Sequence, residues 1–355
     1  MVAPQPFDSK EFYSRQVVLS ELGTKGQKKL NHSKVVVVGL GGLGSASSLY
    51  LALAGVGCLR LVDQDTVEMN NLHRQILYDL GDLRYPKVEA AAKRIQQTNS
   101  SIKVEPIPEN VRESNVEEII KDMDCVVDGL DNMRTRYLLN RACVKYKIPY
   151  VFGGAIGIEG NLSVFHSPKT PCLECVMPNL DDRYMPTCEV RGVLGATAGI
   201  IGTMQAMETI KLLTGIGEPL EGKLMVCDFR DMYFAVIDIF KKADCPICQG
   251  ELIKPIEEKE RLVWLCGRNT VNVNPQKPIS MNLEEVYETL KRHFKIIVKS
   301  SLVIVFKYNK DVEISLFNHG RMLLKNVKDE EHALKVYNNV LAKLGLRTSM
   351  NKPTR

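Results

Sequence analysis

The residues with the clearest chemical potential are cysteines, of which the chain has ten. Four of them form two widely separated CxxC pairs, Cys172 with Cys175 and Cys245 with Cys248. Two such pairs supply four thiolates, the ligand set of a tetrahedral structural zinc ion. We therefore predict a Zn²⁺ site from these residues. The alternatives are two separate redox pairs or four unrelated core cysteines.

A fifth cysteine, Cys188, lies between these pairs in a polar segment that is predicted to be a loop, close to Pro186. Cys125, Cys143 and Cys227 instead occupy apolar runs, where a thiol packs as a small apolar side chain. A loop thiol is accessible to a partner, and its thiolate form is nucleophilic. Cys188 is thus the candidate nucleophile. The alternative is that it only lines the loop.

A glycine-rich segment, KVVVVGLGGLG at residues 34–44, predicts a nucleotide site. Gly39, Gly41 and Gly44 form GxGxxG between a valine-rich strand and a run of small residues that suits a helix. Missing side chains allow a tight turn and let backbone amides approach a phosphate. Asp63 ends the next predicted strand, about 20 residues on, where a carboxylate can bind ribose hydroxyls. The alternative is a tight turn without a ligand.

Polar side chains are dense in the segment after Asp63. They are Asn71, Arg74, Gln75 and Lys87. This density is unusual for a connection between elements, and it falls near the expected nucleotide. A solvated loop with ordinary surface charges is the alternative.

The elements that must position these residues alternate between strands and helices. The sequence predicts helices at 9–30, 115–121, 134–147 and 195–213, with strands at 59–62, 102–106, 125–128, 150–152 and 162–165. This order predicts an α/β, doubly wound, Rossmann-like domain with a largely parallel sheet. Ligands bind at the carboxyl ends of such strands, so Asp63 and Asp131 can converge on one nucleotide.

The chain is predicted to hold two domains, at residues 1–250 and 262–355, joined by a charged linker at 251–261. The second is expected to be small and α+β. Its predicted helices are 282–293 and 329–344, and its predicted strands are 262–265, 295–299, 302–308, 312–317 and 322–327. Asn318, His319 and Gly320 form a hairpin-turn signal between the last two strands.

Charge and composition exclude several classes of partner. The net charge of +5 comes from 47 basic and 42 acidic residues spread along the chain. Because neither sign is concentrated in one block, we expect no nucleic-acid or membrane partner. The N-terminus is polar and lacks an apolar export signal, so a cytoplasmic location is expected.

With these motifs assembled, residues 10–250 closely resemble the ThiF and MoeB adenylyltransferases and the ubiquitin-activating enzymes that share their adenylation domain. The resemblance rests on SRQ at 14–16, VGLGGLG at 38–44, DQD at 63–65, NLHRQ at 71–75, PKVE at 86–89, DGLDN at 128–132, both CxxC pairs, and PTCEVRGVLG at 186–195.

The resemblance implies ATP and Mg²⁺ as cofactors beside Zn²⁺. It implies that Gly41, with the neighbouring Gly39, Gly42 and Gly44, lies against the triphosphate and that Asp63 binds ribose. The remaining implied contacts are Asn71, Arg74, Gln75 and Lys87 on phosphates, Asp131 on Mg²⁺, and Arg15 in the partner subunit's site of a homodimer.

The implied reaction joins the C-terminal glycine carboxylate of a small β-grasp protein, ending in Gly-Gly, to AMP, and then transfers it to Cys188 as a thioester. The alternative is a sulfur-carrier adenylyltransferase without that thioester. A conjugating enzyme or a sulfur donor is the expected further partner. An NAD-dependent dehydrogenase and an inactive scaffold subunit are less favoured, because a cluster of cations around phosphates suits adenylation. The role of the C-terminal domain stays open.

Overall fold

A computed structural model describes residues 7–184, 188–250, 262–264, 269–275 and 279–346. Contacts divide the chain into two compact units, one of Met1–Leu83 with Lys87–Ile256 and one of Arg84–Pro86 with Glu257–Arg355. The predicted linker at 251–261 lies outside the described residues. Each unit is described by itself.

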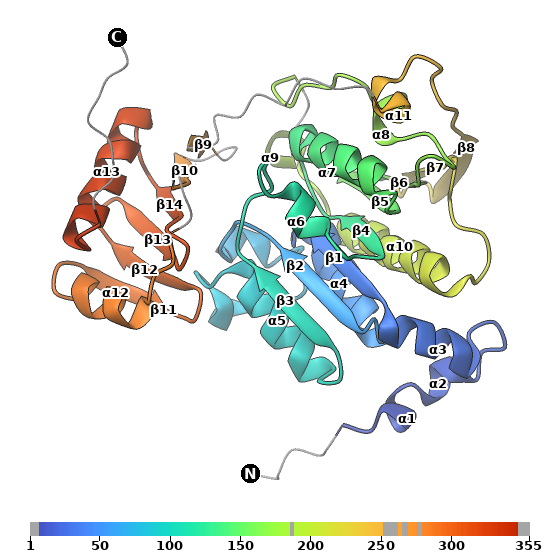
Figure 1. Ribbon diagram of the computed structural model, residues 1–355, viewed down its shortest axis with the longest axis horizontal. Helices are drawn as coiled ribbons and strands as arrows, with labels where there is room; N and C mark the ends of the chain where they lie inside the picture. Colours follow the sequence, from blue (N-terminus) through green and yellow to red (C-terminus); the bar gives the residue numbers. More distant parts are fainter. Residues whose placement is uncertain (1–6, 185–187, 251–261, 265–268, 276–278, 347–355) are drawn as a thin grey trace. The chain divides into compact units, whose positions relative to one another are not determined.

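The first unit is built on an eight-stranded sheet with the order β3-β2-β1-β4-β5-β6-β7-β8 (Figure 1). Strands β1 to β5 pair in parallel and the others antiparallel. The predicted α/β, largely parallel class is therefore confirmed, whereas β7 and β8 were not predicted. The strands are β1 Lys34–Val38, β2 Cys58–Val62, β3 Lys103–Ile107, β4 Cys125–Asp128, β5 Tyr150–Ile156, β6 Glu159–Phe165, β7 Lys223–Asp228 and β8 Tyr233–Asp238.

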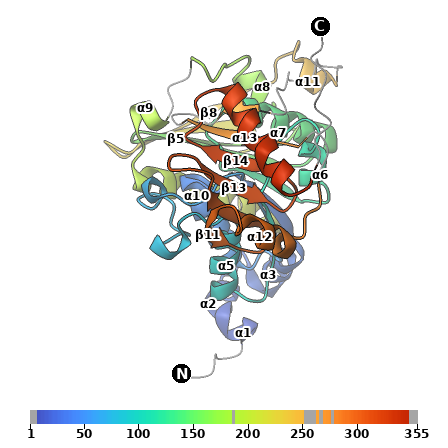
Figure 2. The same ribbon diagram turned by 90° about the vertical axis from the view of Figure 1, so that its left-hand side faces the viewer.

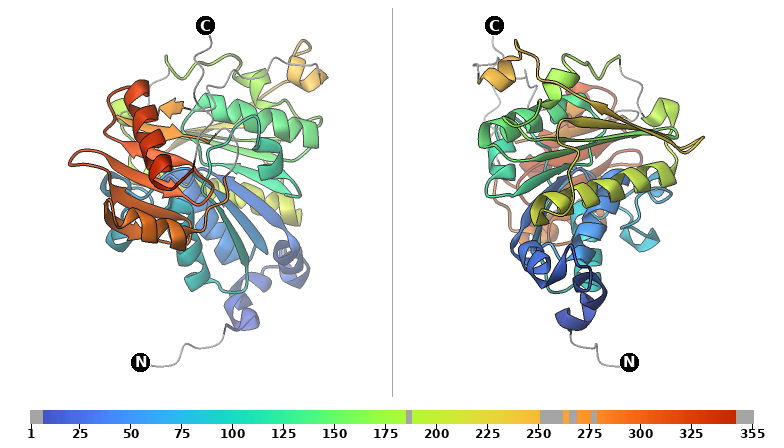
Figure 3. Two further views of the ribbon diagram at one scale, coloured as in Figure 1. Left: turned by 60° about the vertical axis from the view of Figure 1, so that its left-hand side comes forward. Right: turned by 90° about the vertical axis from the view of Figure 1, so that its right-hand side faces the viewer.

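Helices cover both faces of this sheet, which explains why the valines of β1 are buried throughout. Helices α4 (Gly42–Ala54), α5 (Lys87–Thr98) and α10 (Gly195–Thr214) lie on one face. Helices α6 (Val116–Ile120) and α7 (Met133–Tyr146) pack on the other, and Figure 3 shows α10 and α7 on opposite sides. This layering leaves the carboxyl ends of the parallel strands open to a ligand.

The predicted helix at 9–30 is wrong, because three short helices replace it. These are α1 (Ser9–Phe12), α2 (Ser14–Val17) and α3 (Gly23–His32). Tyr13, Leu22 and Leu30 are buried, whereas Phe12 is 38% exposed and Leu19 is 54% exposed, so the apolar residues do not form one helical stripe. A left-handed φ of +57° at Gly23 marks the start of α3.

Short helical segments occur in the connections. They are η1 (Met69–Asn71), η2 (Leu80–Asp82), α8 (Leu173–Val176), α9 (Cys188–Arg191) and α11 (Pro246–Gln249). The segment around Cys188 was expected to be a loop, but Cys188 begins the single helical turn α9.

The second unit has a six-stranded antiparallel sheet with the order β11-β12-β13-β14-β10-β9, and α12 and α13 pack on it in one core (Figure 2). The hairpin turn at 318–320 joins β13 to β14 as predicted, and only β10 was not anticipated. The elements are β9 Leu262–Trp264, β10 Thr270–Val273, α12 Leu283–Leu290, β11 Lys295–Lys299, β12 Val303–Lys307, β13 Glu313–Phe317, β14 Met322–Lys325 and α13 Glu330–Lys343.

Three glycines in the first unit touch where β1, α4 and β4 meet. A Cβ atom at Gly44 would lie 1.8 Å from the carbonyl oxygen of Gly39, and one at Gly129 would lie 2.1 Å from the same oxygen. Gly39 itself has a φ of +86°. The loop after β1 and the loop after β4 therefore lie in backbone contact that no side chain at these positions permits.

We expect Gly44→Ala to lower the free energy of unfolding by about 1–3 kcal/mol, because the new methyl group overpacks the junction. Gly199→Ala in α10 is the matched control, since a Cβ there has nothing within 4 Å. That control should be neutral or stabilising by up to about 1 kcal/mol, the helix preference for alanine. Urea denaturation midpoints measure both, and equal stability of the two variants would contradict the packing argument.

Candidate functional site

Asp63 connects the glycine loop to the end of β2. One carboxylate oxygen accepts a hydrogen bond of 2.7 Å from the Leu40 amide, and the other accepts one of 2.7 Å from the Asp65 amide. Burial raises the pKa of Asp63 above its usual range, and the positive charge of Lys87 acts in the opposite direction. The carboxylate thus fixes the backbone of the loop.

Lys87, the first residue of α5, is a buried cation beside two acids. Its Nζ lies 3.0 Å from Oδ2 of Asp65, and 7% of its side chain is exposed. Burial alone would lower the pKa of Lys87, but Asp63 and Asp65 raise it above its ordinary value, with a smaller contribution from Asp131. A protonated amine is therefore held at this edge of the sheet.

The segment after η1 lies against the glycine loop. A Cβ at Gly41 would be 3.9 Å from Nε2 of Gln75, and one at Gly42 would be 3.5 Å from the carbonyl oxygen of Arg74. Gln75 is 3% exposed, and Asn71, which is also buried, accepts a hydrogen bond from the Glu68 amide. The segment that contains η1 thus holds the side-chain amides of Asn71 and Gln75, together with Arg74, beside the glycine loop.

Asp131 lies two residues after Gly129, in the loop that follows β4, and it is exposed. Its neighbour Leu130 donates its amide to Asp128 at 2.8 Å. The structure therefore brings most of the predicted site residues to the carboxyl ends of β1, β2 and β4. The residues gathered there are Gly39, Gly41, Gly42, Gly44, Asp63, Asn71, Arg74, Gln75, Lys87 and Asp131.

A buried ion pair between Asp128 and Arg136, which was not predicted from the sequence, lies behind this edge. Asp128 is fully buried, the Arg136 side chain is 11% exposed, and Nε of Arg136 lies 2.9 Å from the carboxylate. The available signal was an arginine one turn into the helix that follows the Asp131 loop.

Arg15 lies away from this site within its own chain. Its neighbour Gln16 donates to the carbonyl of Ala54 at 2.9 Å, and Ala54 is the last residue of α4. Helix α4 begins at Gly42 and has 13 residues, so about 20 Å separate its ends at 1.5 Å per residue. The structure does not bring the exposed Arg15 to the glycine loop.

The two CxxC pairs do come together, through α8 and α11. The sulfur of Cys172 lies 3.8 Å from that of Cys245, and the sulfur of Cys175 lies 3.6 Å from that of Cys248. All four sulfurs are within 4.8 Å of one another. Four thiolates at about 2.3 Å from a tetrahedral zinc ion are about 3.8 Å apart, so this donor set fits zinc.

The segment that follows Cys188 is anchored to the sheet and leads to the site. The Gly157 amide donates to Gly192 at 2.8 Å, and the Leu194 amide donates to Gly157 at 3.0 Å. A Cβ at Gly195, where α10 begins, would be 2.5 Å from the carbonyl oxygen of His73. The start of α10 therefore packs on the backbone beside Arg74.

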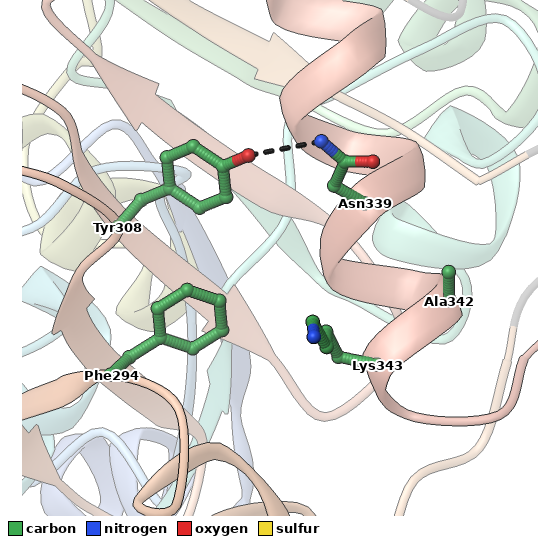
Figure 4. Close-up of a pocket in the computed structure, with 5 residues that line it drawn as sticks. All are labelled: Phe294, Tyr308, Asn339, Ala342 and Lys343. Carbon is green, nitrogen blue, oxygen red and sulfur yellow. Dashed lines mark hydrogen bonds between the residues drawn. The ribbon is translucent and has the colours of Figure 1, made fainter.

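The second unit has a pocket of different character (Figure 4). Two aromatic rings face a helix there, and Nδ2 of Asn339 donates to the hydroxyl of Tyr308 at 3.0 Å. The residues that line the pocket are Phe294, Tyr308, Asn339, Ala342 and Lys343. This set contains no carboxylate, thiol or imidazole that could bind a metal or act as a base near pH 7.

Comparison with known protein families decides the assignment of the first unit. A family model described as the ThiF family matches residues 13–247. The chain belongs to the ThiF family. In the part of the chain that is described, no helix is both long and apolar enough to span a membrane.

Several curated ThiF-family relatives are similar to this chain. It is 45% identical over 238 residues to "Adenylyltransferase and sulfurtransferase MOCS3" of Culex quinquefasciatus, covering 66% of this chain and 54% of that protein. It is 41% identical to the "SAMP-activating enzyme E1" of Haloferax volcanii, and the match covers 69% of this chain and 91% of that protein. It is 40% identical to the "Sulfur carrier protein adenylyltransferase" of Thermus thermophilus, and that match covers 67% of this chain and 90% of that protein. The chain thus spans about half the length of its MOCS3-type relatives.

Solved structures support the same fold. The structure of Escherichia coli MccB with ATP is 23% identical to this chain with a TM-score of 0.60, and covers 68% of this chain and 75% of its own. The structure of PaaA is 24% identical with a TM-score of 0.57, and covers 68% and 79%. At this level of identity, the similarity shows the fold.

Removal of the buried Lys87 amine should leave the carboxylates of Asp63 and Asp65 without the positive charge that offsets their repulsion. We expect Lys87→Met to lower the free energy of unfolding of the ligand-free protein by about 3 kcal/mol at pH 7, because a buried charge loses its partner. The loss should shrink toward pH 4, since protonation of the carboxylates removes their repulsion.

Lys103→Met is the matched control for this measurement. Lys103 also pairs with an acid, Glu105, but its side chain is 70% exposed. Such a surface pair contributes about 0–1 kcal/mol. Denaturation curves that are equal for the two variants at pH 7 would show that Lys87 is not an essential partner of the two acids.

Proposed function

We propose that this chain is an ATP-dependent activating enzyme that adenylates the C-terminal glycine carboxylate of a small β-grasp protein of the ubiquitin-like or sulfur-carrier class. The observation that carries the proposal is the convergence of the glycine loop, the buried amine of Lys87 and the Asp131 loop at one sheet edge. The names of the similar activating enzyme and sulfur-carrier adenylyltransferase support the same class of reaction.

The proposed chemistry needs positive charge more than it needs a base. A carboxylate oxygen attacks the α-phosphorus of ATP, the bond to the bridging oxygen breaks, and pyrophosphate leaves with the electron pair. Because the nucleophile is already an anion, cations must offset its repulsion by the phosphates. When bound, Mg²⁺ supplies charge neutralisation on the phosphates, and Asp131 is the residue proposed to hold it.

The chain's own residues take the remaining roles. Gly41 and its neighbours offer backbone amides to the triphosphate, and Asp63 binds ribose. Lys87 and Arg74 neutralise phosphate charge, while Asn71 and Gln75 donate amide hydrogen bonds. A scaffold subunit would not need these charged groups, and hydride transfer to NAD has no use for the cations.

Arg15 is proposed to act in a second copy of the chain. Its position beyond the far end of α4 supports this role, because an arginine side chain cannot span the length of that helix. A homodimer in which each Arg15 reaches the other subunit's phosphates would complete the site.

The edge strand β8 supports a β-rich protein as the substrate. Within the described residues β8 ends the sheet, and Tyr233, Phe234, Val236 and Ile237 are 43% to 63% exposed. An edge strand offers unpaired backbone groups to another strand, and exposed apolar side chains add contact area. We propose that the β-grasp protein docks here with its C-terminal tail directed to the glycine loop.

In the first candidate function, Cys188 then takes the carrier from AMP and holds it as a thioester. In the second candidate, the carrier is adenylated but no thioester with the enzyme forms. The names of the MOCS3-type relatives and of the Thermus thermophilus relative refer to sulfur transfer and sulfur carriers, which favours this candidate. In that case the sulfur of an external donor attacks the carbonyl carbon of the carrier adenylate, AMP leaves, and Cys188 has no covalent role.

Pyrophosphate exchange tests the proposed adenylation. With a β-grasp protein ending in Gly-Gly, wild type should exchange labelled pyrophosphate into ATP, and Asp131→Ala should reduce the rate at least about 100-fold with an unchanged fold. The control is Asp311→Ala, which replaces an exposed aspartate of the second unit.

Mixed dimers of Arg15→Ala and Asp131→Ala chains should regain activity, because one of the two sites then has both residues intact. Verified mixed dimers that stay inactive would place Arg15 outside the partner's site.

We propose that the two CxxC pairs bind a structural zinc ion. Elemental analysis should then find one zinc ion per chain. All four thiols of the two pairs should resist alkylation until a chelator removes the metal, because thiolates bound to zinc are shielded. Cys172→Ser should lose zinc and stability together. Metal-free protein from a preparation without chelators, with four freely reacting thiols, would contradict the assignment.

Cys188 distinguishes the two candidate functions. If it accepts the adenylated carrier, wild type given ATP and Mg²⁺ should form a carrier-sized adduct that dithiothreitol cleaves, as expected for a thioester. Cys188→Ala should retain pyrophosphate exchange and form no adduct, and any adduct of Cys188→Ser should resist dithiothreitol. Wild type that exchanges pyrophosphate but forms no adduct would establish the second candidate.

A further inference from the structure

The position of Asp131 depends on the peptide group that precedes it. The carbonyl oxygen of Leu130 and the amide nitrogen of Asp131 belong to one planar peptide unit, so fixing the carbonyl also fixes the direction in which Asp131 leaves the loop. The Leu130 carbonyl accepts a hydrogen bond of 2.7 Å from Nη2 of Arg136. On the other side, Asn132 caps α7 by accepting a hydrogen bond of 2.9 Å from the Thr135 amide. Asp131 is thus held between two fixed points.

Arg136 binds three acceptors with one guanidinium group and so joins the end of β4 and its loop to β5. Besides Leu130, it donates through Nε to Asp128 at the end of β4 at 2.9 Å, and through Nη2 to the Gly153 carbonyl in β5 at 2.7 Å. Its guanidinium carbon also lies 4.9 Å from the centre of the Phe152 ring. A planar group with several donors in fixed directions can satisfy these acceptors together, whereas a lysine ammonium cannot reproduce that geometry.

The charge of Arg136 is already used within the protein. Asp128 is fully buried and faces the guanidinium, and it also accepts a hydrogen bond of 2.7 Å from Tyr150. The pair neutralises itself, so Arg136 is not available to offset the charge of a phosphate. What remains for Arg136 to contribute to a reaction is geometry.

We propose that Arg136 is a positioning residue that sets the Asp131 carboxylate for Mg²⁺ by holding the Leu130 peptide. The inference rests on the proposed function and deepens it, because it assigns part of the metal affinity to a residue that touches neither metal nor nucleotide. Groups that orient a metal ligand in this way typically change metal affinity about 10- to 100-fold when they are altered.

ATP binding to the full chain, measured by calorimetry without any carrier protein, tests this role. The ratio of the Kd in EDTA to the Kd in Mg²⁺ reports how much the metal adds to ATP binding. Arg136→Lys keeps the charge beside Asp128 but loses the planar guanidinium that also binds the Leu130 carbonyl. With that carbonyl released, the ratio should fall at least about ten-fold. The Kd in EDTA should stay within about two-fold of wild type, since the glycine loop is unchanged.

Tyr150→Phe is the matched control. It removes a buried hydrogen bond to the same Asp128 carboxylate but leaves the Leu130 carbonyl bound to Arg136. Its melting temperature should fall while its Kd ratio equals that of wild type. If Arg136→Lys does not fold, the double variant Arg136→Met with Asp128→Asn removes both charges and should show the same loss of the ratio.

The outcomes separate the two proposals. A wild-type ratio well above one with an equal ratio in Arg136→Lys, or in the double variant, would overturn the positioning role and leave the proposed function intact. A wild-type ratio of one would remove Mg²⁺ from the proposed function and the positioning role with it. A ratio that falls equally in Tyr150→Phe and Arg136→Lys would show general destabilisation and overturn the inference.

Discussion

The backbone contact around the Gly39 carbonyl fixes how closely the glycine loop approaches the loop that carries Asp131. Because that oxygen lies against the Cα positions of Gly44 and Gly129, the ends of β1 and β4 approach more closely than side chains permit. This contact places the turn that binds phosphates in Rossmann-like folds beside the loop that carries Asp131. The same contact explains why the glycines are needed even without a ligand.

Charges at the sheet edge are arranged in two layers around this contact. The outer layer places the amine of Lys87 beside Asp63 and Asp65, where a nucleotide would bind. The inner layer pairs the fully buried Asp128 with Arg136, whose side chain is 11% exposed, and bonds both residues to the loop backbone. The Asp128–Arg136 pair holds the loop backbone, whereas the Lys87 amine is proposed to supply the positive charge that phosphate chemistry requires.

Much of the first unit could be predicted from sequence, because β1, β2 and β4 are largely apolar runs that lead to Gly39, Asp63 and Asp128. The two CxxC pairs likewise predicted a cluster that the structure assembles. Strands β7 and β8 escaped prediction, since an exposed edge such as Tyr233–Asp238 has no alternation between buried and exposed positions. The leading helix was wrong because Phe12 and Leu19 of the expected apolar stripe are exposed, whereas Tyr13, Leu22 and Leu30 are buried. Arg136 was missed because only the folded chain brings its side chain against residues 128–130 and against Gly153 of β5.

Intact-mass spectrometry of the carrier protein detects the proposed adenylate itself. After incubation of the Cys188→Ala chain, which cannot pass the carrier on to Cys188, with ATP, Mg²⁺ and a β-grasp protein ending in Gly-Gly, the carrier should gain one adenylyl group at its C-terminus, the mass of AMP less one water, with release of pyrophosphate. A carrier that gains the mass of one phosphate, or that stays unmodified with every Gly-Gly protein of the same organism, would contradict adenylation by this chain.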